Sequence, residues 1–259
     1  ENGVWARVYH GKASGGSLNI ENKYTAFQFG YDRQVVPGTW IGGALSWTDG
    51  SSDFSAGGGD NSVLALTGYG SKLWDNGLFL DVTAKYSRIK NEFDIVSNVG
   101  RTTADYDTNA FSMSAEAGWR LYPLHNAFFV EPQVEVMYGH VESVDYTTST
   151  GVKVEQDAAD TLIGRAGVVL GVKCPNDRGN AYVRASVLHD WKGETEYRFG
   201  KDGAMRTISG DLGDTLTEFG IGANFNATKQ VHVYADVEAT SGAEIDTDNR
   251  VNLGVRYVF

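Results

Sequence analysis

In the last nine residues of the chain, every second position is apolar: Val251, Leu253, Val255, Tyr257 and Phe259. Side chains of a β-strand point alternately to its two faces, so this row predicts a strand with one apolar face that continues to the final residue. Chain ends usually fray in water, and an ordered terminal strand therefore needs partners on both edges. A closed transmembrane barrel supplies them, because its last strand pairs with its first.

Twelve segments of the chain repeat this period. In one of them Phe219, Ile221 and Ala223 alternate with polar or glycine positions. Strands of an outer-membrane barrel alternate in this way, apolar toward lipid and polar toward the lumen. The sequence therefore predicts an all-β fold, a closed antiparallel barrel of twelve transmembrane strands. The predicted strands are residues 4–10, 25–32, 41–48, 61–73, 77–87, 110–121, 128–140, 161–173, 181–190, 217–225, 231–238 and 251–259.

The connections between these segments fall into two alternating classes. Short turns are predicted around residues 37–38, 75–77, 123–126, 175–179 and 227–229. Long polar connections are predicted at residues 12–23, 49–60, 88–109, 141–160, 191–216 and 239–250. Outer-membrane barrels have short periplasmic turns and longer extracellular loops. An even strand number then places both termini on the periplasmic side.

Composition narrows the class of protein further. The 259 residues include 32 Gly, 13 Tyr, 12 Phe and 6 Trp, which suits many strands with a close-packed lumen and aromatic girdles. Mean hydropathy is -0.30, and no apolar run approaches the roughly 20 residues of a membrane-spanning helix. The net charge of -11 argues against a nucleic-acid partner. The single cysteine, Cys174, allows no disulfide within the chain, and we predict no cofactor and no metal site.

A soluble all-β sandwich is the plain alternative, because strict alternation with one polar face suits it too. Two features count against it. All six long connections fall on one side of the predicted sheet, and the polar faces carry small and charged residues rather than a mixture typical of water-facing strands.

One predicted strand, residues 61–73, is irregular, since Leu64 and Leu66 lie out of phase with Tyr69.

Seven short segments of this chain, taken in order, resemble the C-terminal translocator domain of type V autotransporters over essentially the whole length. No single segment is specific, but their order and spacing are. They are residues 3–8 (GVWARV), 27–32 (FQFGYD), 115–120 (AEAGWR), 130–135 (VEPQVE), 162–167 (LIGRAG), 184–188 (RASVL) and 255–259 (VRYVF).

The resemblance implies a twelve-stranded barrel in the bacterial outer membrane that moves an N-terminal passenger domain to the cell surface. It also implies help from the barrel assembly machinery, contact with outer-membrane lipid and lipopolysaccharide, and a monomer. In that family a helix threads the lumen just upstream of the first strand. Here Trp5 stands near the start of the chain, so residues 1–259 are expected to form one translocator domain without that helix and passenger.

One branch of the family releases its passenger by self-cleavage inside the barrel. There an asparagine of the lumen segment attacks its own backbone carbonyl, assisted by acidic residues of the wall. Asp81, Glu116 and Glu135 match those acidic positions, and alternation points all three inward on consecutive strands. Carboxylates crowded in a partly dehydrated pore can exchange protons near neutral pH. The resemblance thus implies that these residues are catalytic toward a segment that this chain does not contain.

The alternative for these acids is structural. Barrel lumens are polar by default, and inward acids commonly pair with inward bases in a ladder. The residues expected to take part as charge partners in the lumen are Arg7, Lys85, Arg120, Glu131, Arg165 and Arg256.

Aromatic residues have two further expected roles. Tyr257 and Phe259, again by resemblance, form the signal that the assembly machinery recognises. All six tryptophans fall near predicted strand ends and are expected in the interface girdles; they are Trp5, Trp40, Trp47, Trp74, Trp119 and Trp191.

Two rival functions remain open at this point. A passive porin-like channel would need a stable open lumen lined by balanced charges. An outer-membrane enzyme would need a catalytic set at the extracellular rim, where His10 and Asp49 stand without any nucleophile motif.

Overall fold

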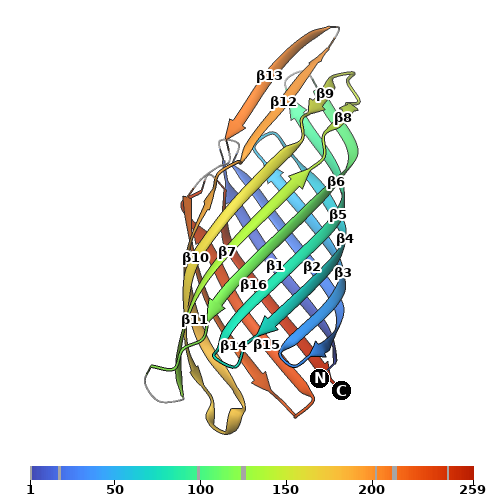
Figure 1. The fold of residues 1–259 in the computed structure, drawn as a ribbon. Coiled ribbons are helices and arrows are strands. Elements are labelled where there is room, and N and C mark those ends of the chain that lie inside the picture. The colour runs from blue at the N-terminus through green and yellow to red at the C-terminus, as the bar shows by residue number, and fades with distance from the viewer. Residues whose placement is uncertain are drawn as a thin grey trace.

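The computed structural model describes residues 2–16, 19–97, 100–123, 127–201, 203–211, 215–243 and 245–259. These residues form a closed antiparallel barrel and a separate four-stranded sheet beyond one end of it (Figure 1). Within the described ranges, no helix is long and apolar enough to cross a membrane.

Twelve strands of the described chain close the barrel, which confirms the predicted fold class and strand number. All neighbouring barrel strands are antiparallel. The barrel strands are β1 (Gly3–Gly15), β2 (Ile20–Val36), β3 (Thr39–Phe54), β4 (Gly57–Leu73), β5 (Leu78–Ser97), β6 (Gly100–Trp119), β7 (Phe128–Val141), β10 (Ala159–Lys173), β11 (Gly179–Asp190), β14 (Thr215–Asn226), β15 (Val231–Ser241) and β16 (Ile245–Val258).

The barrel closes where the last strand pairs with the first. Gly3 of β1 lies opposite Val258 of β16, and the pairing continues to Gly15 opposite Ile245. The amide of Phe259 also donates a hydrogen bond to the Asn2 carbonyl at 2.9 Å. Both termini therefore lie at the same end of the barrel (Figure 1), which we call the terminal end.

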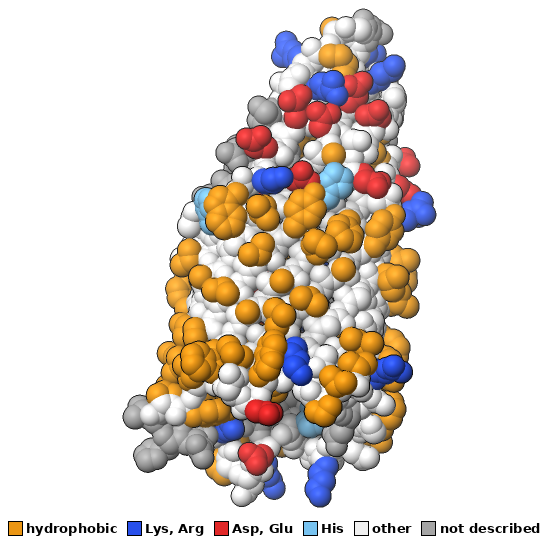
Figure 2. All heavy atoms as spheres, viewed as in Figure 1, with side chains coloured by type: hydrophobic (Ala, Val, Ile, Leu, Met, Phe, Trp, Pro, Cys, Tyr) orange, Lys and Arg blue, Asp and Glu red, His pale blue; other side chains and the backbone are white. Residues whose placement is uncertain are grey.

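The outer face of the barrel is apolar, as alternation predicts. Phe27 is 63%, Leu45 56% and Ile221 62% exposed although all three are strongly hydrophobic. Figure 2 shows such side chains as a band across the face of the barrel in view, with charged residues gathered beyond it toward the four-stranded sheet. An exposed apolar band of this kind is the surface that lipid covers in an outer-membrane barrel.

The irregular fourth strand has a simple explanation. Leu64 and Leu66 of β4 are each 60% exposed on the outer face, whereas Tyr69 points inward. The Tyr69 hydroxyl accepts a hydrogen bond from Trp5 Nε1 at 2.6 Å and donates one to Asp32 Oδ2 at 3.1 Å. An aromatic ring with a polar tip suits the lumen as well as the lipid interface, so Tyr69 can lie out of phase with Leu64 and Leu66 within one regular strand.

The predicted tryptophan girdle is correct only in part. Trp47, Trp74, Trp119 and Trp191 are between 43% and 60% exposed, as girdle residues should be. Trp5 instead lies in the lumen. Trp40 does so too, since it lines the same cavity as Asp32 and Tyr69.

The predicted long connections are largely wrong, because the strands run far beyond the apolar band. β5 and β6, for example, stay paired from Leu78 opposite Trp119 to Ser97 opposite Gly100. Backbone pairing persists there although no lipid demands an apolar face, so the period-2 signal fades before the strand ends. Inside two of these connections lies a further sheet of four strands: β8 (Val144–Thr147), β9 (Lys153–Gln156), β12 (Glu194–Lys201) and β13 (Ala204–Asp211).

Aromatic rings hold this extra sheet against the extended β5–β6 hairpin. Tyr146 of β8 stacks on Tyr106 of β6, with ring centroids 4.6 Å apart and planes 5° apart. The same ring meets Phe93 of β5 edge-on at 5.9 Å.

Short turns at the terminal end agree with the sequence. Gly38 and Gly77 adopt φ values of 70° and 86°, which only glycine tolerates easily. The turn after β10 contains a short 3₁₀-helix, η1 (Pro175–Asp177). Of the predicted turn 123–126, residues 124–126 lie outside the described ranges.

Candidate functional site

Three carboxylates stand in one row on the lumen wall. Asp81 of β5 lies opposite Glu116 of β6, and Glu116 lies opposite Glu135 of β7. Arg165 of β10 continues the row, because it lies opposite Glu135. Val134 next to Glu135 is 58% exposed on the outer face, so by alternation the row points inward. The structure thus brings together the three acids expected to be catalytic.

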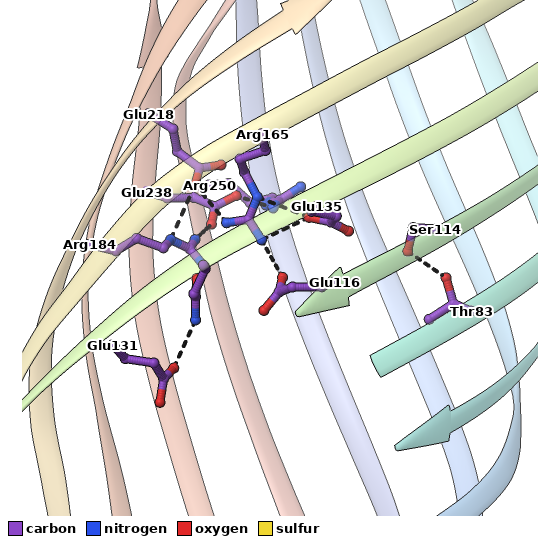
Figure 3. A network of polar contacts seen from close by, with 11 residues as sticks. Thr83, Ser114, Glu116, Glu131, Glu135, Arg165, Arg184, Glu218, Glu238 and Arg250 are labelled. Atoms are coloured by element: carbon purple, nitrogen blue, oxygen red, sulfur yellow. Dashed lines mark hydrogen bonds and ion pairs between the residues drawn. The ribbon is translucent and has the colours of Figure 1, made fainter. Parts of the chain in front are cut away.

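Arg165 gathers two of these carboxylates around its guanidinium (Figure 3). Its Nε donates to Glu135 Oε2 at 2.9 Å, and its Nη2 forms a short ion pair with Glu116 Oε2. Only 9% of the Arg165 side chain is exposed. Losing one partner of such a buried pair leaves an uncompensated charge, which is far more costly than breaking an exposed pair. Glu116 and Glu135 are therefore held side by side.

The ion pairs continue from Arg165 around half of the lumen. Arg165 Nη1 lies 3.7 Å from Glu218 Oε1, and the same oxygen lies 3.2 Å from Arg184 Nε. Arg184 then pairs with Glu238, which also pairs with Arg250. We call this set the charged belt, one residue from each of seven neighbouring strands (β6, β7, β10, β11, β14, β15 and β16): Glu116, Glu135, Arg165, Arg184, Glu218, Glu238 and Arg250.

Asp81 stands outside the charged belt. Its carboxylate accepts a hydrogen bond from Ser71, and among the described residues it has no cationic partner. Asp81 and Glu116 both line a cavity of 710 Å³ that opens at the terminal end of the lumen. A group that enters this cavity would meet one carboxylate held by arginine and one that is not.

A second ion pair stands at the same cavity. Arg120 Nε donates to Glu131 Oε2 at 2.5 Å, and Gln133 Nε2 donates to the other oxygen of Glu131 at 2.8 Å. Glu131 is only 5% exposed. The Arg120 guanidinium also lies 4.5 Å from the centre of the Phe129 ring. Glu131 is therefore saturated by its neighbours.

At the barrel closure, Arg256 of β16 reaches across β1 to Asp32 of β2. Its two terminal nitrogens lie 2.5 Å from the two Asp32 oxygens. Tyr69 and Trp5 complete this network through the hydrogen bonds described above. Gly3 of β1 lies beneath the guanidinium, and a Cβ there would stand 3.0 Å from it.

The remaining two expected charge partners, Arg7 and Lys85, form no ion pair within the described part of the chain. The Arg7 guanidinium lies 5.0 Å from the centre of the Tyr9 ring and hydrogen-bonds to Tyr234. Lys85 is half-buried and inward-facing, between Thr67 of β4 and Ser112 of β6.

His10 and Asp49, the only candidates for an enzyme at the rim, point outward. His10 Nδ1 lies 2.9 Å from Thr25 Oγ1, and Asp49 accepts a hydrogen bond from Trp47 Nε1 at 3.0 Å. Trp47 itself is 59% exposed. Both side chains therefore lie on the outer face of the barrel and not in its lumen.

The two terminal aromatic residues also point outward. Tyr257 and Phe259 are 43% and 59% exposed, and their ring centroids lie 6.2 Å apart. Such a surface is accessible to a partner before lipid covers it.

Sequence analysis missed four members of the charged belt: Arg184, Glu218, Glu238 and Arg250. Arg184, Glu218 and Glu238 occupy inward positions of predicted strands, so the same alternation would have found them, whereas Arg250 lies in the predicted connection 239–250. Alternation in the sequence indicates which face of the strand a residue occupies, but it does not indicate which residue of another strand it pairs with.

The family model described as Autotransporter beta-domain matches residues 4–238. The curated protein "Probable autotransporter YcgV" of Escherichia coli (strain K12) is 29% identical over 99% of this chain and 27% of its own length. The pertactin autotransporter of Bordetella parapertussis is 27% identical over 98% of this chain and 28% of its own length. The chain thus spans about a quarter of the length of these relatives.

A solved structure with a similar barrel is the beta domain of the Bordetella autotransporter BrkA. It has a TM-score of 0.81 and 26% identity, and covers 100% of this chain and 99% of its own. The translocator domain of NalP from Neisseria meningitidis has a TM-score of 0.84 at 14% identity, with coverage of 100% and 88%, and so shows the shared fold.

Proposed function

The chain belongs to the autotransporter beta-domain family, and from this premise we propose that it anchors an N-terminal passenger domain and helps to move it to the cell surface. The barrel is an integral protein of the outer membrane. Its terminal end faces the periplasm, and its four-stranded sheet faces the outside. The observation that supports translocation most directly is the closed barrel with an apolar outer face and a polar lumen into which Trp5 and Arg7 of the first strand project.

Several partners follow from this proposal. Outer-membrane lipid and lipopolysaccharide would cover the apolar band, and the barrel assembly machinery would recognise the outward rings of Tyr257 and Phe259. Residues 1–259 would act as one translocator domain and as a monomer, since each barrel encloses its own lumen.

The test uses the full-length gene product expressed in an outer membrane. Protease added to intact cells should digest a surface-exposed passenger while the barrel remains protected. A product without any passenger at the surface would contradict translocation and favour the porin-like alternative.

We further propose that Asp81, Glu116 and Glu135 assist release of the passenger inside the barrel. In this reaction the side-chain amide nitrogen of an asparagine in the lumen segment bonds to its own backbone carbonyl carbon. The peptide C–N bond breaks, a succinimide forms, and the departing amine takes up a proton. No water, metal or external nucleophile is consumed.

The geometry supports a division of roles among the three acids. Arg165 holds Glu116 and Glu135 next to each other, so they would orient the reacting amide. Asp81 has no cationic partner among the described residues and faces the same cavity as Glu116, so it is the best placed to exchange a proton.

Carboxamide variants test this role in the full-length protein. Glu116→Gln, Glu135→Gln and Asp81→Asn should leave the passenger joined to the barrel but still exposed on the surface. The matched control is Glu238→Gln, which removes a belt carboxylate that does not touch Arg165. Cleavage at the normal rate in all three variants would make these acids structural members of the lumen wall.

A further inference from the structure

The lumen has two unlike walls. The charged belt covers one half with ion pairs. Facing inward on β4, β5 and β6 is a set of hydroxyl side chains that we call the neutral wall: Thr67, Thr83, Ser112 and Ser114. Figure 3 shows Thr83 and Ser114 apart from the belt, joined only to each other.

Lys85 stands in the middle of the neutral wall. Its register neighbours are Thr67 and Ser112, and the next inward residue of its own strand is Thr83. The nearest inward acid on that strand is Asp81, four positions away, which is about 13 Å at 3.3 Å per residue. Asp81 is therefore beyond the reach of a direct ion pair with Lys85.

The acids of the charged belt do not supply a partner for Lys85 either. Each of them already pairs with arginine, and Glu218 is shared by two. Within the described residues, Lys85 forms no ion pair with any carboxylate. A half-buried ammonium without a carboxylate partner can pair with an anion that enters the lumen.

The space beside Lys85 is open. Thr83 points into the lumen and yet is exposed, so no other side chain of the wall covers it. Its Oγ1 lies 3.0 Å from Ser114 Oγ, so one of the two hydroxyl groups donates to the other and one O–H remains beside the lysine as an additional donor. One cation flanked by hydroxyl donors is a suitable site for a carboxylate.

We propose that Lys85 is a docking site for an acidic side chain of a peptide segment that occupies the lumen. The site rests on the proposed function, because a threading segment is what would bring the carboxylate. It fixes where such a segment lies: along the neutral wall, with an Asp or Glu at the level of Lys85, beside the end of the charged belt that begins at Glu116 of β6.

The experiment measures binding of a defined probe to the barrel as it exists here. The probes are fluorescent decaglutamate and decaserine peptides, and the readout is fluorescence anisotropy in detergent at low salt. Lys85→Gln should raise the Kd for decaglutamate about fivefold or more, since one charge-assisted contact contributes on the order of 1 kcal/mol. The matched control, Lys90→Gln, removes an exposed lysine of the same strand that faces outward and should leave the Kd unchanged.

A covalent readout places the peptide within the lumen. In a Cys174→Ser background, the Thr83→Cys thiolate should attack a decaglutamate whose terminal cysteine is activated as a 2-pyridyl disulfide. The mixed disulfide forms as pyridine-2-thione leaves, and Lys85→Gln should suppress the reaction. Equal binding by Lys85→Gln and wild type, or equal loss with Lys90→Gln, would overturn the proposal. The protease assay on intact cells tests translocation independently. If the passenger is exposed normally but the barrel does not bind the peptide, only the Lys85 site is rejected. If no passenger is exposed, translocation is rejected and the result of the peptide experiment is unaffected.

Discussion

The barrel and the four-stranded sheet are both antiparallel, yet they use the same kind of residue differently. Val134 of β7 and Ile208 of β13 are exposed to almost the same extent, 58% and 56%. Val134 lies in the apolar band that lipid covers, whereas Ile208 lies beyond it in water. The two side chains are equally exposed on the protein surface, but lipid covers one and water surrounds the other. The same substitution should therefore have different effects at the two positions.

The edges of the two sheets differ as well. Every barrel strand has two neighbours, because β16 pairs with β1. In the smaller sheet, β13 lies at one end of the strand order and pairs only with β12 among the described strands. The barrel is thus stabilised by closure, and the smaller sheet by side chains such as the stacked rings of Tyr106 and Tyr146.

The largest expected effect separates the two surroundings directly. Val134→Arg should lower the free energy of unfolding by about 2–4 kcal/mol, because it places a charge on the lipid face near mid-strand. Ile208→Arg should change it by less than about 0.5 kcal/mol, as surface substitutions in water usually do. Denaturant titration of the barrel in lipid vesicles measures both.

The control on the other face of the same strand is Gln133→Arg, whose side chain points into the lumen. It should lower the free energy of unfolding much less than Val134→Arg does. Equal losses at positions 133 and 134 would invalidate the assignment of faces.

The next effect concerns the aromatic contact between Tyr106 and Tyr146, which stabilises the smaller sheet in the way that closure stabilises the barrel. Tyr146→Leu keeps an apolar side chain but loses the stacking on Tyr106, which contributes about 0.5–1.5 kcal/mol beyond area burial. Amide hydrogen exchange of β8 and β9 should therefore accelerate. Strands β14 and β15 within the barrel serve as the internal reference, and if they accelerate equally the two regions do not unfold separately.

A pH titration sharpens the same comparison. Burial raises the pKa of Tyr146 to about 12, while an unfolded tyrosine titrates near 10. Below pH 10 both states keep the proton. Between about pH 10 and 12 the unfolded state loses it first, so the sheet loses stability as the pH rises through that window. Tyrosinate absorbance together with exchange of β9 should reveal this step. Tyr146→Phe should reduce it, and the remainder comes from Tyr106 and Tyr197, whose pKa values burial also raises.

The smallest effect lies where barrel strands leave the membrane. Glu21 Oε2 lies 2.8 Å from Lys12 Nζ, and Glu21 Oε1 lies 2.7 Å from Lys23 Nζ. Hydrogen bonds from Lys12 and then Lys23 lower the pKa of Glu21 to about 2. Its contribution is complete above the ordinary value of 4.5 and is lost as the pH falls toward 2. Glu21→Gln should be nearly neutral and its effect should vanish at high salt, because both partners are exposed; a salt-independent loss would indicate another role.

The sequence predicted what the lipid enforces. Alternation located all twelve barrel strands, because a polar residue on the outer face would contact hydrocarbon. It missed β8, β9, β12 and β13, where water surrounds both faces and no strict alternation is required. The same reason explains why alternation does not reveal the extension of β5 and β6 beyond the apolar band.

Within the lumen, the sequence predicted faces but not partners. Alternation pointed Glu116 and Glu135 inward, and their adjacency followed from neighbouring strands. That Arg165 would also bridge to Glu218 of β14, and that Lys85 would stand alone, depends on the tilt and stagger of strands around the closed barrel. Those quantities are set by the whole circumference and cannot be obtained from one segment.

The pairing of β1 with β16 carries a consequence for the order of events in biogenesis. The contact between Gly3 and Val258 joins the first and the last strand of the barrel, so it forms only after all twelve barrel strands have been synthesised. Until then the growing polypeptide has two unsatisfied edges and no route into hydrocarbon as a completed cylinder. Commitment to the membrane is thus a property of the complete barrel, and termination before the last strand yields a product that must be shielded or degraded rather than a smaller pore.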